Sequence, residues 1–283
     1  MAGRADFITQ APRDVAGWMA RFDASALPVL AETADQLEAL RANEDAVDAH
    51  LLAEIVSTDP LMTLKLLAHV AGVRRGRGRE DSDAETVTAA LVMLGITPFF
   101  RAFGPQPTVE DRLADQPEAL EGFQRVLRRS HRAANFAVAF AAHRMDHDAP
   151  VIHSAALLHD FAELLLWVYA PTLALQIGQR QLADPALRSA AVQRELLHVE
   201  LADLQHSLML QWRLPALLVN ITDDHLHGDS AQVRNVLLAI RIARHSAAGW
   251  DNPALPDDVV AISELLQMGV DPSWRLLLEI DGA

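Results

Sequence analysis

The run ALLHDFAELLL at residues 156–166 places a histidine and an aspartate, His159 and Asp160, side by side in an apolar stretch. A buried charge is costly unless it is paired or binds a metal. Imidazole and carboxylate both coordinate divalent ions, so the pair could be part of a metal site. The alternative is a structural cluster in which Asp160 pairs with an arginine and His159 bonds a backbone carbonyl or Glu163. We favour the structural cluster, because buried polar groups are normally hydrogen-bonded.

The elements that position this pair are predicted to be helices throughout. Period-two apolar patterns are missing, and Leu, Ala, Arg and Glu dominate the chain, all of which favour helices. We expect one helix to open at Ser25, another to run from Pro60 to Gly72, and a third to stop at Gly95. A single helix should hold the His-Asp pair between Asp148 and Pro171. The fold class is therefore all-α, a two-lobed orthogonal helical bundle.

The proline and glycine content indicates where the two lobes divide. Residues 104–122 hold three Pro and two Gly, which makes this stretch the best boundary. We expect the following parts: an N-terminal segment at 1–19, a main domain at 20–245 with lobes at about 20–110 and about 118–245, and a C-terminal helical extension at 246–283.

Composition excludes several functions. The chain of 283 residues has no cysteine, so disulfides, thiolate zinc sites and a cysteine nucleophile are ruled out. Its net charge of −14 argues against nucleic-acid binding, which relies on Lys and Arg neutralising phosphates. The N-terminus lacks the pattern of a signal peptide, and no run reaches the roughly 18 apolar residues of a membrane span. We expect a cytoplasmic protein that does not enter a membrane.

The segment RRGRGR at residues 74–79 is strongly basic, although the chain as a whole has a negative net charge. Its guanidinium groups could hold a phosphate or an acidic partner, since the arginine fork suits such groups. The alternative, which we favour, is a solvated loop balanced by the acidic residues that follow. The candidate anion-binding residues are Arg74, Arg75, Arg77 and Arg79.

Several motifs in a fixed order resemble the HDOD family, the HD-related output domains of bacterial signalling proteins. The resemblance covers roughly residues 20 to 245. The motifs, in chain order, are LPVL at 27–30, STDPLMTLKLLAHVAG at 57–72, AALVMLGI at 89–96, AALLHDFAELLL at 155–166 and RELLHVELADLQHSLMLQWRLPALLVNI at 194–221.

The resemblance also implies an incomplete metal site. The parent HD superfamily contains metal-dependent phosphohydrolases, whose ligands are a first His, the His-Asp pair and a late Asp. Alignment places Arg129 at the first His, although a shift of two residues would bring His131 there, and Arg244 at the late Asp. A guanidinium stays protonated and offers no lone pair. We therefore expect no divalent metal and no other cofactor at His159 and Asp160. If the pair does bind a metal, His131 or His225 could supply a further ligand.

The function implied by the resemblance is a non-enzymatic output or adaptor module. Such a module would act through protein–protein contacts with bacterial signalling proteins supplied by separate chains. A residual metal-dependent phosphohydrolase or phosphodiesterase is the alternative from another class. A nucleotide- or RNA-binding regulator that uses the arginine-rich loop is a third, weaker reading.

Overall fold

A computed structural model describes residues 6–76, 84–184, 187–221 and 230–282, without the side chains of 74–76 and 221. The described residues form α-helices and two short 3-10 helices, η1 and η2, with no strand beyond a single bridge between Val29 and Thr108. This confirms the all-α class. Contacts between residues divide the chain into two compact units: unit 1 is Met1–Val126 with Phe161–Pro215, and unit 2 is Leu127–Asp160 with Ala216–Ala283.

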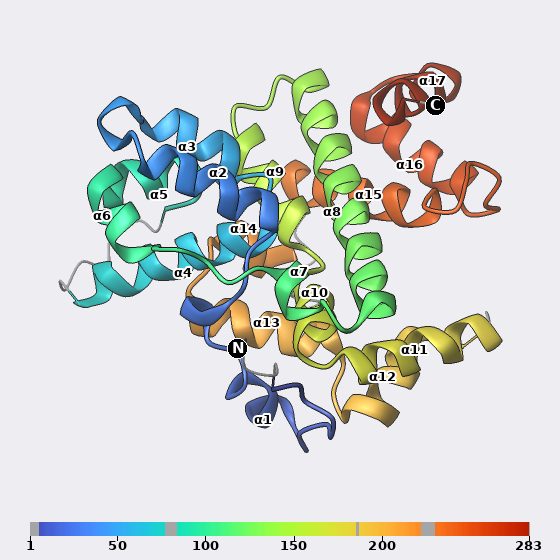
Figure 1. The fold of residues 1–283 in the computed structure, drawn as a ribbon. Helices are drawn as coiled ribbons and strands as arrows, with labels where there is room; N and C mark the ends of the chain where they lie inside the picture. Colours follow the sequence, from blue (N-terminus) through green and yellow to red (C-terminus); the bar gives the residue numbers. More distant parts are fainter. Residues whose placement is uncertain (1–5, 77–83, 185–186, 222–229, 283) are drawn as a thin grey trace. The chain divides into compact units, whose positions relative to one another are not determined.

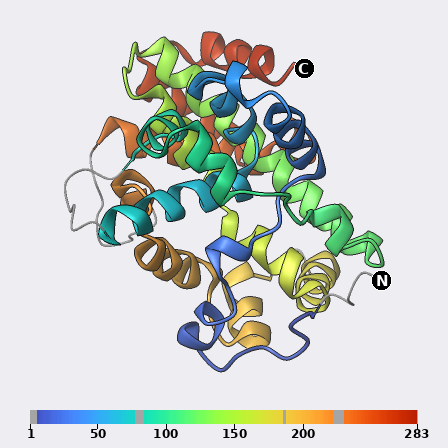
Figure 2. The same ribbon diagram turned by 60° about the vertical axis from the view of Figure 1, so that its left-hand side comes forward.

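Unit 1 holds most of the N-terminal helices and four later ones (Figure 1). Its elements are α1 (Val15–Met19), η1 (Ala24–Ala26), α2 (Ala31–Arg41), η2 (Glu44–Ala46), α3 (Ala49–Val56), α4 (Pro60–Gly76), α5 (Val87–Leu94), α6 (Ile96–Ala102), α7 (Val109–Arg112), the first residues of α8 (Pro117–His143), α10 (Phe161–Tyr169), α11 (Pro171–Ala183), α12 (Ser189–Leu197) and α13 (Leu201–Trp212). Figure 2 shows α4 in cyan, and α4 is in contact with α5.

Unit 2 contains the part of α8 from Leu127 onward. Its other helices are α9 (Ala149–Leu158), α14 (Ala216–Ile221), α15 (Ala231–His245), α16 (Leu255–Leu266) and α17 (Val270–Asp281). α15 packs on α9, α14 and α16, and α16 packs on α17. The buried Asn235 of α15 donates from Nδ2 to the backbone oxygen of Ala137 in α8 at 3.1 Å. That bond joins α8 to α15.

The contact-based units differ from the lobes expected from the sequence. The division falls inside α8, between Val126 and Leu127, rather than at residues 104–122. Residues 161–215 group with the N-terminal part, because α13 packs on α1 and α4 while α10 packs on α13. Such packing depends on contacts between residues far apart in sequence.

Buried caps explain where the main helices begin and end. Asp59 is fully buried, and its Oδ1 accepts from the backbone N–H groups of Leu61 and Met62 at 2.8 and 3.0 Å. Its Oδ2 accepts from Leu30 N at 2.8 Å, so one carboxylate caps α4 and fixes a distant segment. α4 therefore begins at Pro60 as expected, and α5 ends at Gly95, which adopts a φ of +85°.

Three helix predictions were wrong. The helix expected from Ser25 begins only at Ala31, because residues 27–30 are extended and Val29 exchanges backbone hydrogen bonds with Pro107 and Val109 at 2.9 Å each. The helix expected to stop at Gly72 continues to Gly76. The helix expected around the His-Asp pair is two helices, α9 and α10, separated by His159 and Asp160.

Among the described residues, the stretch Ala149–Tyr169 is long and apolar enough to cross a membrane by length and composition alone, although Asp160 and Glu163 interrupt its apolar residues. In the structure, 72% of its most apolar window is buried inside the protein. Burial of this kind is typical of core helices in soluble proteins.

The close approach of α8 to Trp167 gives a packing prediction. A Cβ added to Gly122 would lie closer than 3.0 Å to three ring carbons of Trp167, a side chain that is itself buried. Gly122→Ala is expected to destabilise the protein by about 1–3 kcal/mol, as overpacking does, despite the roughly 1 kcal/mol by which alanine favours a helix. Urea unfolding measures this change.

The matched control is Gly178→Ala in α11, where an added Cβ would meet nothing within 4 Å. This variant should be as stable as the wild type or slightly more so. Equal stability of the two alanine variants would contradict the close packing at Trp167.

Candidate functional site

His159 and Asp160 occupy the junction between α9 and α10. α9 ends at Leu158 and α10 begins at Phe161, so both polar residues lie where the helical run is interrupted. Their neighbours Leu158 and Phe161 are fully buried, and the Asp160 side chain is 13% exposed. The junction therefore holds a charge at the edge of an apolar core.

Two arginines surround the Asp160 carboxylate. Arg129 of α8 donates to Oδ2 from both Nε at 2.9 Å and Nη2 at 2.7 Å. Arg244 of α15 donates from Nη2 to Oδ1 at 3.4 Å, and Nδ1 of His159 lies 2.9 Å from the same oxygen. Three helices of unit 2 thus meet at one carboxylate.

The electrostatics of this cluster favour ionised Asp160. Burial alone would raise the pKa of Asp160, but the hydrogen bond and charge of His159, followed by the charges of Arg129 and Arg244, lower that pKa well below its ordinary value. The carboxylate is therefore negative across the physiological range and neutralised by the surrounding cations.

This arrangement does not fit a divalent metal at Asp160. Both carboxylate oxygens accept bonds from cationic groups, and a guanidinium has no lone pair to offer an ion. Within the described ranges of the chain, no three His, Asp or Glu side chains are grouped as a metal site requires. The sequence alignment that placed Arg129 and Arg244 beside the pair matches the observed contacts.

The structure describes only one of the two histidines considered as further metal ligands. His131 of α8 lies close enough to His153 of α9 to affect it: burial lowers the pKa of His153, and the charge of His131 lowers that pKa further. His225 lies outside the described residues.

The arginine-rich candidate is only partly described. Arg74 and Arg75 belong to the last turn of α4, so this part of the segment is helix rather than the loop expected from its glycines. Arg77 and Arg79 lie outside the described residues.

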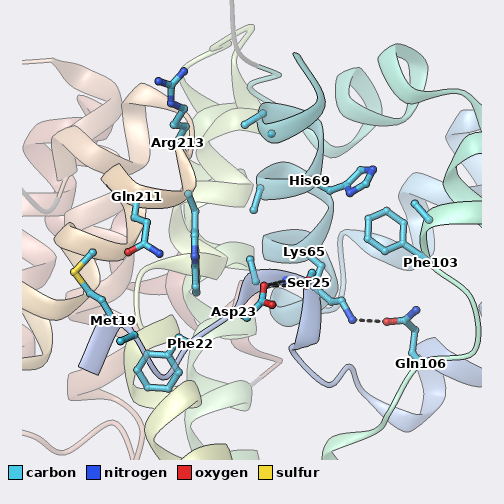
Figure 3. A pocket seen from close by; sticks show the side chains of 17 residues that line it. Met19, Phe22, Asp23, Ser25, Lys65, His69, Phe103, Gln106, Gln211 and Arg213 are labelled. Carbon is cyan, nitrogen blue, oxygen red and sulfur yellow. Dashed lines mark hydrogen bonds between the residues drawn. The ribbon is translucent and has the colours of Figure 1, made fainter. Parts of the chain in front are cut away.

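A cavity in unit 1 was not anticipated from the sequence. It has a volume of about 510 Å³ and lies against α4, with contributions from α1, η1, α6 and α13. Figure 3 shows Lys65 near Asp23 and Ser25, with His69, Phe103 and Gln106 on one side and Met19, Gln211 and Arg213 on the other. The only sequence signal was a lysine inside the apolar run LMTLKLLAHVAG.

Lys65 is the most unusual residue of the cavity. The residue is only 3% exposed, and its Nζ donates to the backbone oxygen of Leu27 at 2.7 Å and to Oε1 of Gln106. Burial lowers the pKa of Lys65 to about 8, although the negative charges of Asp59 and Asp23 act to raise it. A buried lysine with a lowered pKa and a cavity beside it is a candidate binding group.

The fold and the cation-bound aspartate define an all-α protein of the HD-like helical class. The sequence matches the HDOD domain over residues 27–227, which is more than half of the chain. The chain therefore belongs to the HDOD family, as its motifs indicated. No curated protein matches the sequence at a significant level.

Solved structures share this fold. The MmoQ response regulator of Methylococcus capsulatus is 21% identical, with a TM-score of 0.66 over 89% of this chain and 98% of that one. A virulence factor of Campylobacter jejuni is 19% identical, with a TM-score of 0.60 over 90% of this chain and 88% of that one. At these identities the likeness concerns the fold alone.

Proposed function

We propose that this chain is a non-enzymatic output or adaptor module that acts in bacterial signalling through contacts with proteins supplied by separate chains. It works in the cytoplasm and needs no metal or other cofactor. The observation that carries the proposal is the pairing of Asp160 with Arg129 and Arg244. By the resemblance, the corresponding aspartate of an HD hydrolase would hold a metal ion, whereas here it pairs with two arginines.

The family relationship supports the signalling part of this proposal. The HDOD match covers both the α4 region and the His-Asp junction. One protein of similar fold is described as a response regulator. A module of this kind transmits its signal by binding another protein, so its effect depends on the surface it presents rather than on turnover.

The first test measures metal content and hydrolysis together. Tag-free protein, purified without chelator, is analysed for metals and then assayed with Mg²⁺, Mn²⁺ or Ni²⁺ on p-nitrophenyl phosphate and bis(p-nitrophenyl) phosphate. We expect less than stoichiometric metal and the same background hydrolysis for the wild type and for Asp160→Asn. One metal per chain that disappears in His159→Ala, with hydrolysis lost in Asp160→Asn, would contradict the proposal and favour the phosphohydrolase.

The second test addresses the partner. Cross-linking in the source cells, followed by mass spectrometry, should join this chain to a protein with a kinase or receiver domain. Cross-links confined to metabolic enzymes or to nucleic acid would contradict the adaptor role. The cross-linked peptides would also locate the contact surface on unit 1 or unit 2.

A further inference from the structure

The floor of the cavity on α4 is made of small residues. Ala68, Ala71 and Gly72 line it, and a Cβ added to Gly72 would meet nothing within 4 Å. Gly72 is exposed, so the cavity opens to solvent on this side of the helix. Its volume of about 510 Å³ falls in the range of roughly 300–1,000 Å³ typical of small-molecule sites.

This lining contains hydrogen-bond donors that have no acceptor among the described residues. Lys65 has three N–H bonds and, within the described part of the chain, gives two of them to Leu27 and Gln106. Among the same residues, the indole N–H of Trp212 has no acceptor, and the guanidinium of Arg213 has no ion pair. Unused donors beside a hollow favour a ligand that accepts hydrogen bonds.

The charge of the lining points to an anion. Two cationic residues, Lys65 and Arg213, face one carboxylate among the described residues, that of Asp23. The Oδ1 atom of Asp23 already accepts from the backbone N–H and the hydroxyl of Ser25 at 2.9 and 2.8 Å. Asp59, which lies outside the lining, also acts on Lys65, so Lys65 and Arg213 are the two cationic groups that could hold an anion here rather than an excess of positive charge.

The rest of the lining is apolar and partly aromatic. Phe22, Phe103 and Trp212 contribute rings, and Met19 contributes a flexible thioether. Trp212 also stacks at a tilt on Phe161, with ring centroids 5.8 Å apart, so its plane is held in place. A fixed indole is a good surface for a flat ligand body.

We propose that this cavity binds a small organic anion, whose carboxylate or phosphate accepts a hydrogen bond from Lys65 and whose flat apolar body packs against Trp212. Arg213, at the exposed rim, attracts the anion from solution. The site would give the module a small-molecule input, and it does not depend on the adaptor role. Carboxylate and phosphate ligands share this chemistry, and the experiment below separates them.

The state of Lys65 gives the binding a pH dependence. An anion is bound best by the protonated amine, so its affinity should fall as pH rises through the Lys65 pKa of about 8. The other titratable groups near Lys65 are Asp59, Asp23 and His69, and burial lowers the pKa of His69, which keeps that imidazole neutral in the same range. Arg213 stays charged throughout.

Calorimetric titration of the full chain at pH 7 tests the proposal with two pairs of probes. Adenosine 5′-monophosphate is compared with adenosine, and 4-hydroxybenzoate with 4-hydroxybenzamide. At least one anion should bind ten times more tightly than its neutral counterpart and lose affinity between pH 7 and 9. Binding of the first anion alone identifies a phosphate ligand, and binding of the second alone identifies a carboxylate ligand.

Gly72→Leu fills the cavity without removing a polar group, and it should weaken the anion at least tenfold. Gly178→Leu on α11 is the matched control and should bind like the wild type, because both glycines have open space around them. Lys65→Gln should also weaken the anion, although this variant removes two structural hydrogen bonds. The proposal is overturned if neither anion binds, if the neutral probes bind equally well, or if Gly72→Leu binds as the wild type does.

Discussion

Asp160→Ala is expected to lower the free energy of unfolding by about 3–5 kcal/mol, the usual cost of removing one partner of a buried ion pair. The substitution leaves Arg129, whose side chain is 19% exposed, without its carboxylate. Arg244 is 53% exposed and can turn to solvent, so its share of the loss is smaller. Urea unfolding followed by circular dichroism measures the change.

Two control variants separate this effect from ordinary loss of a charge. His159→Ala removes one hydrogen bond and should cost about 1–3 kcal/mol. Glu264→Ala breaks an exposed pair with Arg234 in the same unit and should cost less than about 1 kcal/mol. An Asp160→Ala variant no less stable than Glu264→Ala would mean that the pair carries no structural role.

The same cluster predicts a loss of stability in acid. The pKa of Asp160 is lower in the folded protein than in the unfolded chain, where it is about 3.9. The unfolded state therefore binds its proton first, and the stabilisation present above about pH 4 disappears as pH falls towards the folded pKa. The difference in stability between the wild type and Asp160→Asn should shrink as pH is lowered below about 4.

Asp281→Ala is expected to cost up to about 3 kcal/mol, since it removes the carboxylate partner of a partly buried arginine, although Arg132 keeps its hydrogen bonds to Ala243 O and Ser246 Oγ. Arg132 of α8 donates to the two oxygens of Asp281 from Nε at 2.7 Å and Nη2 at 2.9 Å. Trp250 Nε1 donates to the same carboxylate at 3.1 Å. The side chains of Arg132 and Asp281 are 24% and 16% exposed, so solvent screens this pair only in part.

The matched control for Asp281→Ala is Glu279→Ala, which removes an exposed carboxylate from the same helix, α17. Its effect should stay within about 0.5 kcal/mol, as for most surface substitutions. Limited proteolysis should cut α17 of Asp281→Ala faster than α17 of the control. Equal cleavage and equal urea midpoints would show that α17 is held by its apolar contacts alone.

The sequence by itself determined the helical class and the family. Helix formers without period-two patterns predict an all-α chain, and local signals such as Asp59-Pro60 and Gly95 locate helix ends, because a cap acts on the few backbone groups next to it. The order of the motifs indicated the HDOD family, which the match over residues 27–227 confirms. The alignment with the HD superfamily also placed Arg129 and Arg244 at ligand positions, and both side chains contact Asp160 in the structure.

The tertiary structure determined the features that local sequence signals do not specify. Residues 27–30 are extended because Val29 pairs with Pro107 and Val109, about 80 residues away. The helix around the His-Asp pair breaks at Asp160, where residues of α8 and α15 reach the carboxylate. The cavity beside Lys65 exists because four other elements, α1, η1, α6 and α13, surround one face of α4. Each of these features depends on contacts between distant parts of the chain, which periodicity and capping cannot specify.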